Sequence, residues 1–289
     1  MTFKKSIVIL LASLFMFAFK SDKPAYMLFD KAAKNIKYGK MLKEIAEADV
    51  IFFGELHNNP ICHWLQIELT KDLYEKMNGN IILGAEMFEA DNQLILNEYI
   101  EGKVSAKNFK KEAKLWPNYK TDYAPLVEFA KANQIGFIAT NIPRRYASIV
   151  YSEGFEGLDS LSAEARSYIA PLPVAYDAEL KGYKAMLEEM KGMGHENENL
   201  PKAQAIKDAT MAYSIAGALE NGKLFIHYNG TYHSNDYEGI IWYLNNYKLG
   251  LKIVTIASAE QANLEKLDEE NENKADYILV IPESMTKTH

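Results

Sequence analysis

The chain has 289 residues with a formal net charge of −7, from 32 basic and 39 acidic residues, and 48% of its residues are hydrophobic. This composition is typical of a globular protein and excludes a disordered chain, a collagen and a coiled coil. No run of Lys and Arg resembles a nucleic-acid-binding surface, so we expect neither DNA nor RNA as a partner.

Residues 1–20 predict an export signal. Lys4 and Lys5 precede an uncharged, apolar stretch of 14 residues, 6–19. As a helix this stretch spans about 21 Å, which suits a signal peptide better than a helix that crosses a hydrocarbon core of ~30 Å. We therefore expect an exported protein of the periplasm or cell envelope. A retained N-terminal anchor is the alternative, because no clear cleavage site precedes Ser21.

The rest of the chain alternates between two patterns. Short, continuous apolar runs predict strands that are covered on both faces, over 49–55, 81–88, 135–141, 223–228, 251–258 and 275–282. Apolar residues at helical spacing predict helices over 61–77, 91–101, 122–133, 201–220 and 234–248. This alternation predicts an α/β fold, with a largely parallel or mixed central sheet flanked by helices.

Residues 144–202 contain no strand-like run. Their patterns predict helices over 144–152, 162–169 and 177–191. We interpret this stretch as a helical cap inserted into a single domain, 21–289, where it covers a site at the ends of the strands.

The first candidate site is Gly54-Glu55-Leu56-His57, which follows a strand of Val, Ile and Phe. In open α/β sheets, ligands bind outside the carboxyl ends of the strands. Glu55 and His57 are two residues apart, so their side chains point to the same side of an extended chain. A metal-binding pair or an acid/base pair requires this arrangement. Alternatively, the segment is a turn in which Glu55 caps the next helix and His57 is merely exposed.

A second strand leads into a matching motif, with the same Gly-x-x-His spacing from Gly230 to His233. His227 lies within that strand, and Tyr232 lies inside the motif. Glycine allows a sharp turn or a close approach to a ligand, and imidazole is a metal ligand or a proton carrier near neutral pH.

Two further strand ends are polar. Glu86 ends a buried strand, where an unpaired carboxylate is costly. Arg144 and Arg145 follow another strand and suit a carboxylate or a phosphate, although ordinary surface pairing explains them equally well.

Weaker candidates lie on helices. Gln204 and Asp208 share one helix face; we interpret them as a surface pair, with bracing of the site as the alternative. Cys62 and His63 are helix neighbours whose side chains diverge by about 100°, so a nucleophilic dyad is not expected.

With these motifs in view, the chain resembles the ChaN-like haem-binding uptake family of the Tiki/TraB/erythromycin-esterase-like superfamily. Four segments carry the resemblance: Gly54 to His57, Gly84-Ala85-Glu86-Met87, the helix around Gln204 and Asp208, and His227 to His233. It implies an α/β core with a helical cap. It also implies haem or iron acquisition at the cell envelope, with haem held in a homodimer and outer-membrane uptake machinery as a partner. Lipoproteins of the family carry an acylated cysteine directly after the signal, and this chain has no cysteine at that position.

Haem needs an apolar slot, an axial ligand and cations for its propionates. On this interpretation Tyr232 or a nearby histidine faces the iron, and Arg144 or Arg145 meets a propionate. The candidate histidines are His57, His227 and His233.

Two other functions are consistent with the same residues. The first is a divalent-metal-dependent hydrolase, of protease or esterase type, in which Glu55, His57, Glu86 and His233 supply ligands and a base. The second is an exported binding or scaffold protein in which the polar cluster is structural.

Overall fold

The computed structural model describes residues 23–192 and 197–289. The predicted export signal, 1–20, lies outside the described residues. Within the described residues, no helix is both long enough and apolar enough to cross a membrane.

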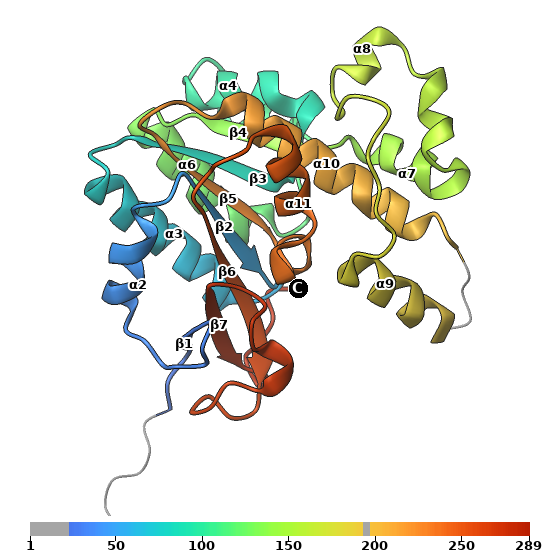
Figure 1. The fold of residues 1–289 in the computed structure, drawn as a ribbon. Helices are drawn as coiled ribbons and strands as arrows, with labels where there is room; N and C mark the ends of the chain where they lie inside the picture. Colours follow the sequence, from blue (N-terminus) through green and yellow to red (C-terminus); the bar gives the residue numbers. More distant parts are fainter. Residues whose placement is uncertain (1–22, 193–196) are drawn as a thin grey trace, which may run out of the picture.

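A seven-stranded sheet forms the centre of the molecule (Figure 1). Its spatial order is β1-β7-β6-β2-β5-β3-β4, and every neighbouring pair is parallel except β1 with β7. The predicted α/β fold is confirmed. The strands are β1 (Met27–Asp30), β2 (Val50–Glu55), β3 (Ile81–Glu89), β4 (Phe137–Asn141), β5 (Leu224–Gly230), β6 (Ile253–Gln261) and β7 (Tyr277–Pro282).

Helices cover both faces of this sheet, so the central strands read as continuous apolar runs. One apolar core lies between the sheet and the helices α2 to α6, and a second lies under α7, α8, α10 and α11. The helices are α2 (Tyr38–Ile45), α3 (Pro60–Lys76), α4 (Gln93–Ile100), α5 (Ala106–Glu112), α6 (Ala124–Asn133), α7 (Arg144–Glu153), α8 (Ala163–Arg166), α9 (Lys181–Gly192), α10 (Leu200–Ala218) and α11 (Ile240–Tyr247).

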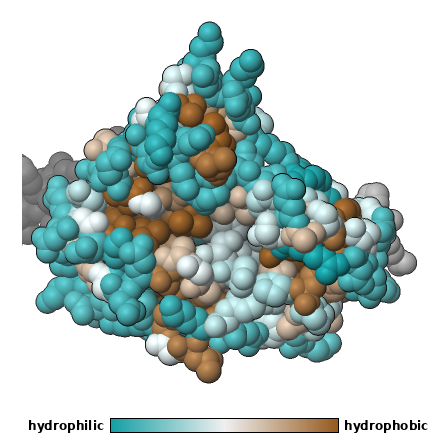
Figure 2. Space-filling view, turned by 90° about the horizontal axis from the view of Figure 1, so that it is seen from above, coloured by the Kyte–Doolittle hydropathy of each residue, from teal (hydrophilic) through white to brown (hydrophobic). Residues whose placement is uncertain are grey.

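The stretch predicted as a cap contains helices and no strand within residues 144–192 and 197–202. Its helices α7, α8 and α9 stand to one side of the sheet in Figure 1. α7 and α9 pack against α10, which in turn packs against β4. The face seen in Figure 2 is largely hydrophilic, with apolar residues in several patches that hydrophilic residues separate.

The strand order places the predicted site residues side by side. β5 lies between β2 and β3, and all three run in parallel, so their carboxyl ends meet at one edge of the sheet. The pairing of β3 with β4 shifts its register between Ala85 and Glu89. Glu86 lies within this irregular part of β3, close to the carboxyl end of the strand.

Candidate functional site

The two Gly-x-x-His motifs fit against each other. β2 and β5 are neighbours in register, with Gly54 opposite Asn229 and Glu55 opposite Gly230. A methyl group on Gly54 would lie 2.8 Å from Thr231, and one on Gly230 would lie 2.7 Å from Nε2 of His57. Each glycine therefore makes room for the other motif, which is the close approach that glycine permits.

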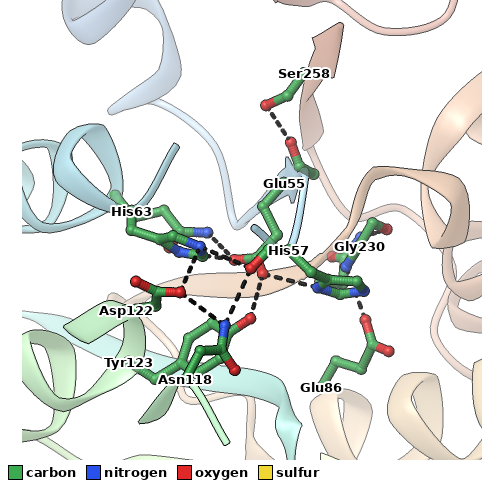
Figure 3. A network of polar contacts seen from close by, with 12 residues as sticks. Glu55, His57, His63, Glu86, Asn118, Asp122, Tyr123, Gly230 and Ser258 are labelled. Carbon is green, nitrogen blue, oxygen red and sulfur yellow. Dashed lines mark hydrogen bonds and ion pairs between the residues drawn. The ribbon is translucent and has the colours of Figure 1, made fainter. Parts of the chain in front are cut away.

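Glu55 is buried at the end of β2, and its carboxylate is held on every side (Figure 3). Oε1 accepts hydrogen bonds from the Tyr123 hydroxyl at 2.8 Å and from His57 Nδ1 at 2.9 Å. Oε2 accepts one from Gln66 Nε2 of α3 at 2.5 Å. A carboxylate fixed in this way orients the imidazole that it contacts.

His57 projects from this carboxylate into the pocket described below. Its side chain is 38% exposed, and its ring meets Trp116 edge-on at 5.0 Å between centroids. Because Nδ1 donates to Glu55, Nε2 remains as the acceptor or ligand atom, next to Gly230. Burial alone would lower the pKa of His57, but the Glu55 hydrogen bond and the charges of Glu86 and Glu55 raise it above its ordinary value.

A further layer holds the loop that carries His57. His63 Nε2 donates to the His57 carbonyl at 3.0 Å, and Asn118 Nδ2 donates to the same oxygen at 3.1 Å. Asn118 also donates to Asp122 at 2.7 Å. Asp122 belongs to a π-helical turn, η2 (Tyr119–Tyr123), an element that often occurs at functional sites. Figure 3 shows these side chains converging on the carboxyl end of β2.

His233 has a different environment, because it lies buried between two carboxylates. Its Nδ1 is 2.5 Å from Oδ1 of Asp208, and its Nε2 is 3.2 Å from Oε1 of Glu86. Burial would lower the pKa of His233, but the two carboxylates raise it to about 10. Burial would likewise raise the pKa of Glu86, but His233 holds it well below its usual range. We therefore describe this group as an imidazolium between carboxylates at neutral pH.

The same carboxylates fasten this group to neighbouring elements. Oε2 of Glu86 accepts the backbone N–H of Gly230 at 2.7 Å. Oδ2 of Asp208 accepts the hydroxyl of Tyr183, on α9, at 2.8 Å. The interpretation of Asp208 as a surface residue was wrong, because α10 packs this residue against the sheet, where it is 1% exposed.

These groups border an open depression of about 570 Å³ at the carboxyl edge of the sheet, which we call the edge pocket. This size lies within the ~300–1,000 Å³ of typical ligand pockets. Sequence reasoning did not single out two of its lining residues, Lys207 of α10 and His289. The lining residues are Glu55, Leu56, His57, Asn58, Glu86, Gln204, Lys207, Gly230, Thr231, Tyr232, His233 and His289.

The other predicted site residues lie elsewhere. His227 is fully buried, with its ring 2.8 Å from Thr140 Oγ1 and 2.9 Å from Asn229 Oδ1, and burial lowers its pKa to about 4. Arg144 and Arg145 are exposed at the start of α7, and Arg145 pairs with Asp91 at 2.5 Å. None of the three lines the edge pocket. The arginines follow β4, which is the outermost strand on its side of the sheet.

Glu55, His57, Glu86 and His233 come together at one edge, but they form two separate pairs. Each pair joins a glutamate to a histidine, Glu55 to His57 and Glu86 to His233. Within residues 23–192 and 197–289, no three His, Cys, Asp or Glu side chains are grouped as metal ligands. Cys62 is buried, and burial raises the pKa of its thiol to about 12.

Comparisons with known proteins agree with this fold. ChaN of Campylobacter jejuni, in a structure described as showing cofacial haem binding, is 20% identical, covers 89% of this chain and 96% of its own, and has a TM-score of 0.67. A Bacillus cereus protein is 14% identical, covers 84% of this chain and 90% of its own, and has a TM-score of 0.50.

Reticulata-related 5, a chloroplastic protein of Arabidopsis thaliana, is 21% identical over 196 residues. The match takes in 63% of this chain but only 26% of that relative. A family model described as haem-binding uptake, Tiki superfamily, ChaN matches residues 41–244. This match takes in more than half of the chain and includes both Gly-x-x-His motifs. The chain therefore belongs to the ChaN haem-binding uptake family of the Tiki superfamily.

Proposed function

We propose that this protein binds haem in the edge pocket as the cargo of a haem or iron uptake system. The observation that carries the proposal is the pocket's lining, which combines a half-exposed tyrosine, a lysine and an oriented histidine. These are Tyr232, Lys207 and His57. Tyrosine and histidine are known haem-iron ligands, and a cation is needed near the propionates.

Tyr232 is our candidate for the iron ligand. Its side chain is 42% exposed on the pocket lining. Its hydroxyl donates a hydrogen bond to the Gly182 carbonyl at the start of α9. Burial, followed by nearby carboxylates, raises the pKa of Tyr232 to about 12. The tyrosine is therefore neutral without a ligand, and iron binding must displace both its proton and its contact with the cap.

The edge pocket is open, so a planar ligand bound in it keeps one face uncovered. A second copy of this chain can cover that face, and we propose a homodimer for this reason. The cofacial haem described for Campylobacter jejuni ChaN is consistent with such an arrangement. The apolar stretch 6–19 supports export to the periplasm or cell envelope, where outer-membrane uptake machinery is the proposed partner.

A haemin titration followed by absorbance tests the proposal. We expect saturable binding with a Soret shift in the protein from Ser21 onward. Tyr232→Phe should change the spectrum and weaken binding about tenfold, which is ~1.4 kcal/mol. Tyr213→Phe is the matched control, because Tyr213 is 45% exposed but does not line the pocket. A linear rise that is identical in all three proteins would overturn the proposal.

One observation favours hydrolysis as a second candidate. Glu55 holds His57 through Nδ1 and leaves Nε2 on the pocket side, which is the arrangement of a general base. Ester or peptide hydrolysis, measured with and without divalent metal ions, tests this candidate. Hydrolysis that disappears in Glu55→Gln and His57→Ala would support it, and no turnover by the unaltered protein would contradict it.

A further inference from the structure

His63 lies on α3 and contacts the loop that carries His57, and its side chain is only 5% exposed. A neutral imidazole has one N–H donor and one acceptor nitrogen, whereas an imidazolium has two donors and no acceptor. The atoms that face the two ring nitrogens of His63 therefore decide its charge.

Both ring nitrogens of His63 face oxygen atoms that can only accept a hydrogen bond. Nε2 lies 3.0 Å from the carbonyl oxygen of His57. Nδ1 lies 3.3 Å from Oε1 of Gln66. The amide of Gln66 cannot be turned round, because its nitrogen donates to the carboxylate of Glu55 at 2.5 Å. Both nitrogens of His63 must therefore carry a proton.

The charges around His63 favour the same state. Glu55 and Asp122 are 1% and 2% exposed, and a buried carboxylate is costly unless it is hydrogen-bonded and paired with a positive charge. Nδ1 of His63 is 3.7 Å from Oε2 of Glu55, and Nε2 is 3.5 Å from Oδ2 of Asp122. Figure 3 shows the ring of His63 beside both carboxylates. In the described parts of the chain, neither carboxylate forms an ion pair with a Lys or an Arg.

The remaining side chains that donate to these two carboxylates, apart from His57, are all neutral. They are Gln66, Tyr123, Asn118 and Thr288. The positive charge between Glu55 and Asp122 therefore has to come from His63.

We infer that His63 is a buried imidazolium that positions His57 and compensates part of the charge of Glu55. Its Nε2–H holds the carbonyl of His57, while its charge acts on the carboxylate that accepts Nδ1–H of His57. Because part of the Glu55 charge is compensated, His57 takes up a proton less readily, and its Nε2 stays available on the pocket side. The inference describes the protein without a ligand, so a failure of haem binding would leave it intact.

Nitrogen-15 NMR of the ligand-free protein at neutral pH tests this inference directly, because the shift of each imidazole nitrogen shows whether it carries a proton. Two other buried histidines serve as internal standards. In spite of burial, two carboxylates raise the pKa of His233 to about 10, so both of its nitrogens are protonated. Burial lowers the pKa of His227 to about 4, so one of its nitrogens is unprotonated. We expect His63 to match His233, and an unprotonated nitrogen on His63 would overturn the inference.

The variant His63→Gln tests the effect on His57. Glutamine can still donate to the His57 carbonyl but has no charge, so the charge of Glu55 acts on His57 without compensation. In an NMR titration the midpoint of His57 should rise by about 0.5–1 pH unit, which is a roughly three- to tenfold higher proton affinity.

Lys71→Gln is the matched control, because it removes a positive charge from the exposed face of the same helix and should leave the midpoint of His57 unchanged. An unchanged midpoint in His63→Gln as well would overturn the compensation of Glu55, since a residue that only fills space would not alter this titration. If His63→Gln does not fold, the nitrogen-15 spectrum of the unaltered protein still decides the charge of His63.

Discussion

His57 and His233 occupy the same position in two copies of one short motif, yet the structure gives them opposite environments. His57 has one carboxylate partner and a side chain that is 38% exposed to the edge pocket. His233 has two carboxylate partners and a side chain that is 6% exposed. His57 can gain or lose a proton or bind a ligand. His233, in contrast, stays a buried cation at neutral pH.

The difference assigns separate roles to the two halves of the site. The pair Glu55 and His57 presents a reactive nitrogen to the pocket. The group of Glu86, His233 and Asp208 ties β3, α10 and the loop after β5 together. A shared motif therefore does not imply a shared chemical role, because burial and the number of counter-charges decide it.

The largest expected effect comes from breaking the buried group. Glu86→Ala leaves the imidazolium of His233 with one counter-charge fewer and the N–H of Gly230 without its acceptor. We expect a loss of about 3–5 kcal/mol in the free energy of unfolding, measured with urea. The control is Glu68→Ala, which removes an exposed glutamate paired with Lys71 and should change stability by less than about 0.5 kcal/mol. Equal losses in the two variants would contradict a special role for the buried group.

The pH dependence of stability should report the same group. The pKa of His233 is raised from 6.5 to about 10 in the folded protein. Its contribution to stability is therefore complete below pH 6.5 and is lost as the pH rises toward 10. Urea unfolding at several pH values should show a decline over this window, with a slope of at most about 1.4 kcal/mol per pH unit. His233→Gln should flatten it, and parallel curves for both proteins would refute the assignment.

Gly230→Ala should disturb the reactive half of the site. The new methyl group would lie 2.7 Å from His57 Nε2, so the imidazole must move away from the pocket wall. We expect a loss of about 1–3 kcal/mol in stability and a weaker haemin affinity. In Gly217→Ala the added methyl group meets nothing within 4 Å, and this variant should be neutral or slightly more stable. Unchanged stability and affinity in Gly230→Ala would show that the two motifs do not interlock.

The smallest expected change is in the titration of His57. Its pKa is raised above 6.5 by the Glu55 hydrogen bond and by nearby carboxylates, against the effect of burial. Glu55→Gln removes one negative charge and should lower this pKa, which the imidazole resonances in an NMR titration would show. His57→Ala should itself cost less than about 1 kcal/mol, because the side chain is partly exposed. A higher pKa in Glu55→Gln would contradict the pairing.

The sequence patterns predicted the six strands β2 to β7, because each is a continuous apolar run. They missed β1, a strand of four residues at the sheet edge that is held by its pairing with β7. The positions of Glu55, His57, Glu86 and His233 at or just after strand ends were enough to predict that these side chains lie close together. The alternation of residues along a strand tells which face a side chain occupies but not how deeply it is buried. It could therefore not show that His227 is fully buried.

Other features depend on the order of strands and the packing of helices, which no local pattern contains. Arg144 and Arg145 seemed equivalent to the other strand-end residues until β4 proved to be an outer strand. Asp208 became part of the site only through the packing of α10 against the sheet. His289 lines the edge pocket because the chain turns back after β7, and residues 286–289 carry no recognisable motif.

The most direct test is a crystal structure of the protein with bound haemin, in which anomalous scattering locates the iron. We predict iron in the edge pocket, within bonding distance of the Tyr232 hydroxyl oxygen. Iron in the larger depression of about 1010 Å³ beside Met27 and Met285, or at scattered surface positions, would contradict this prediction.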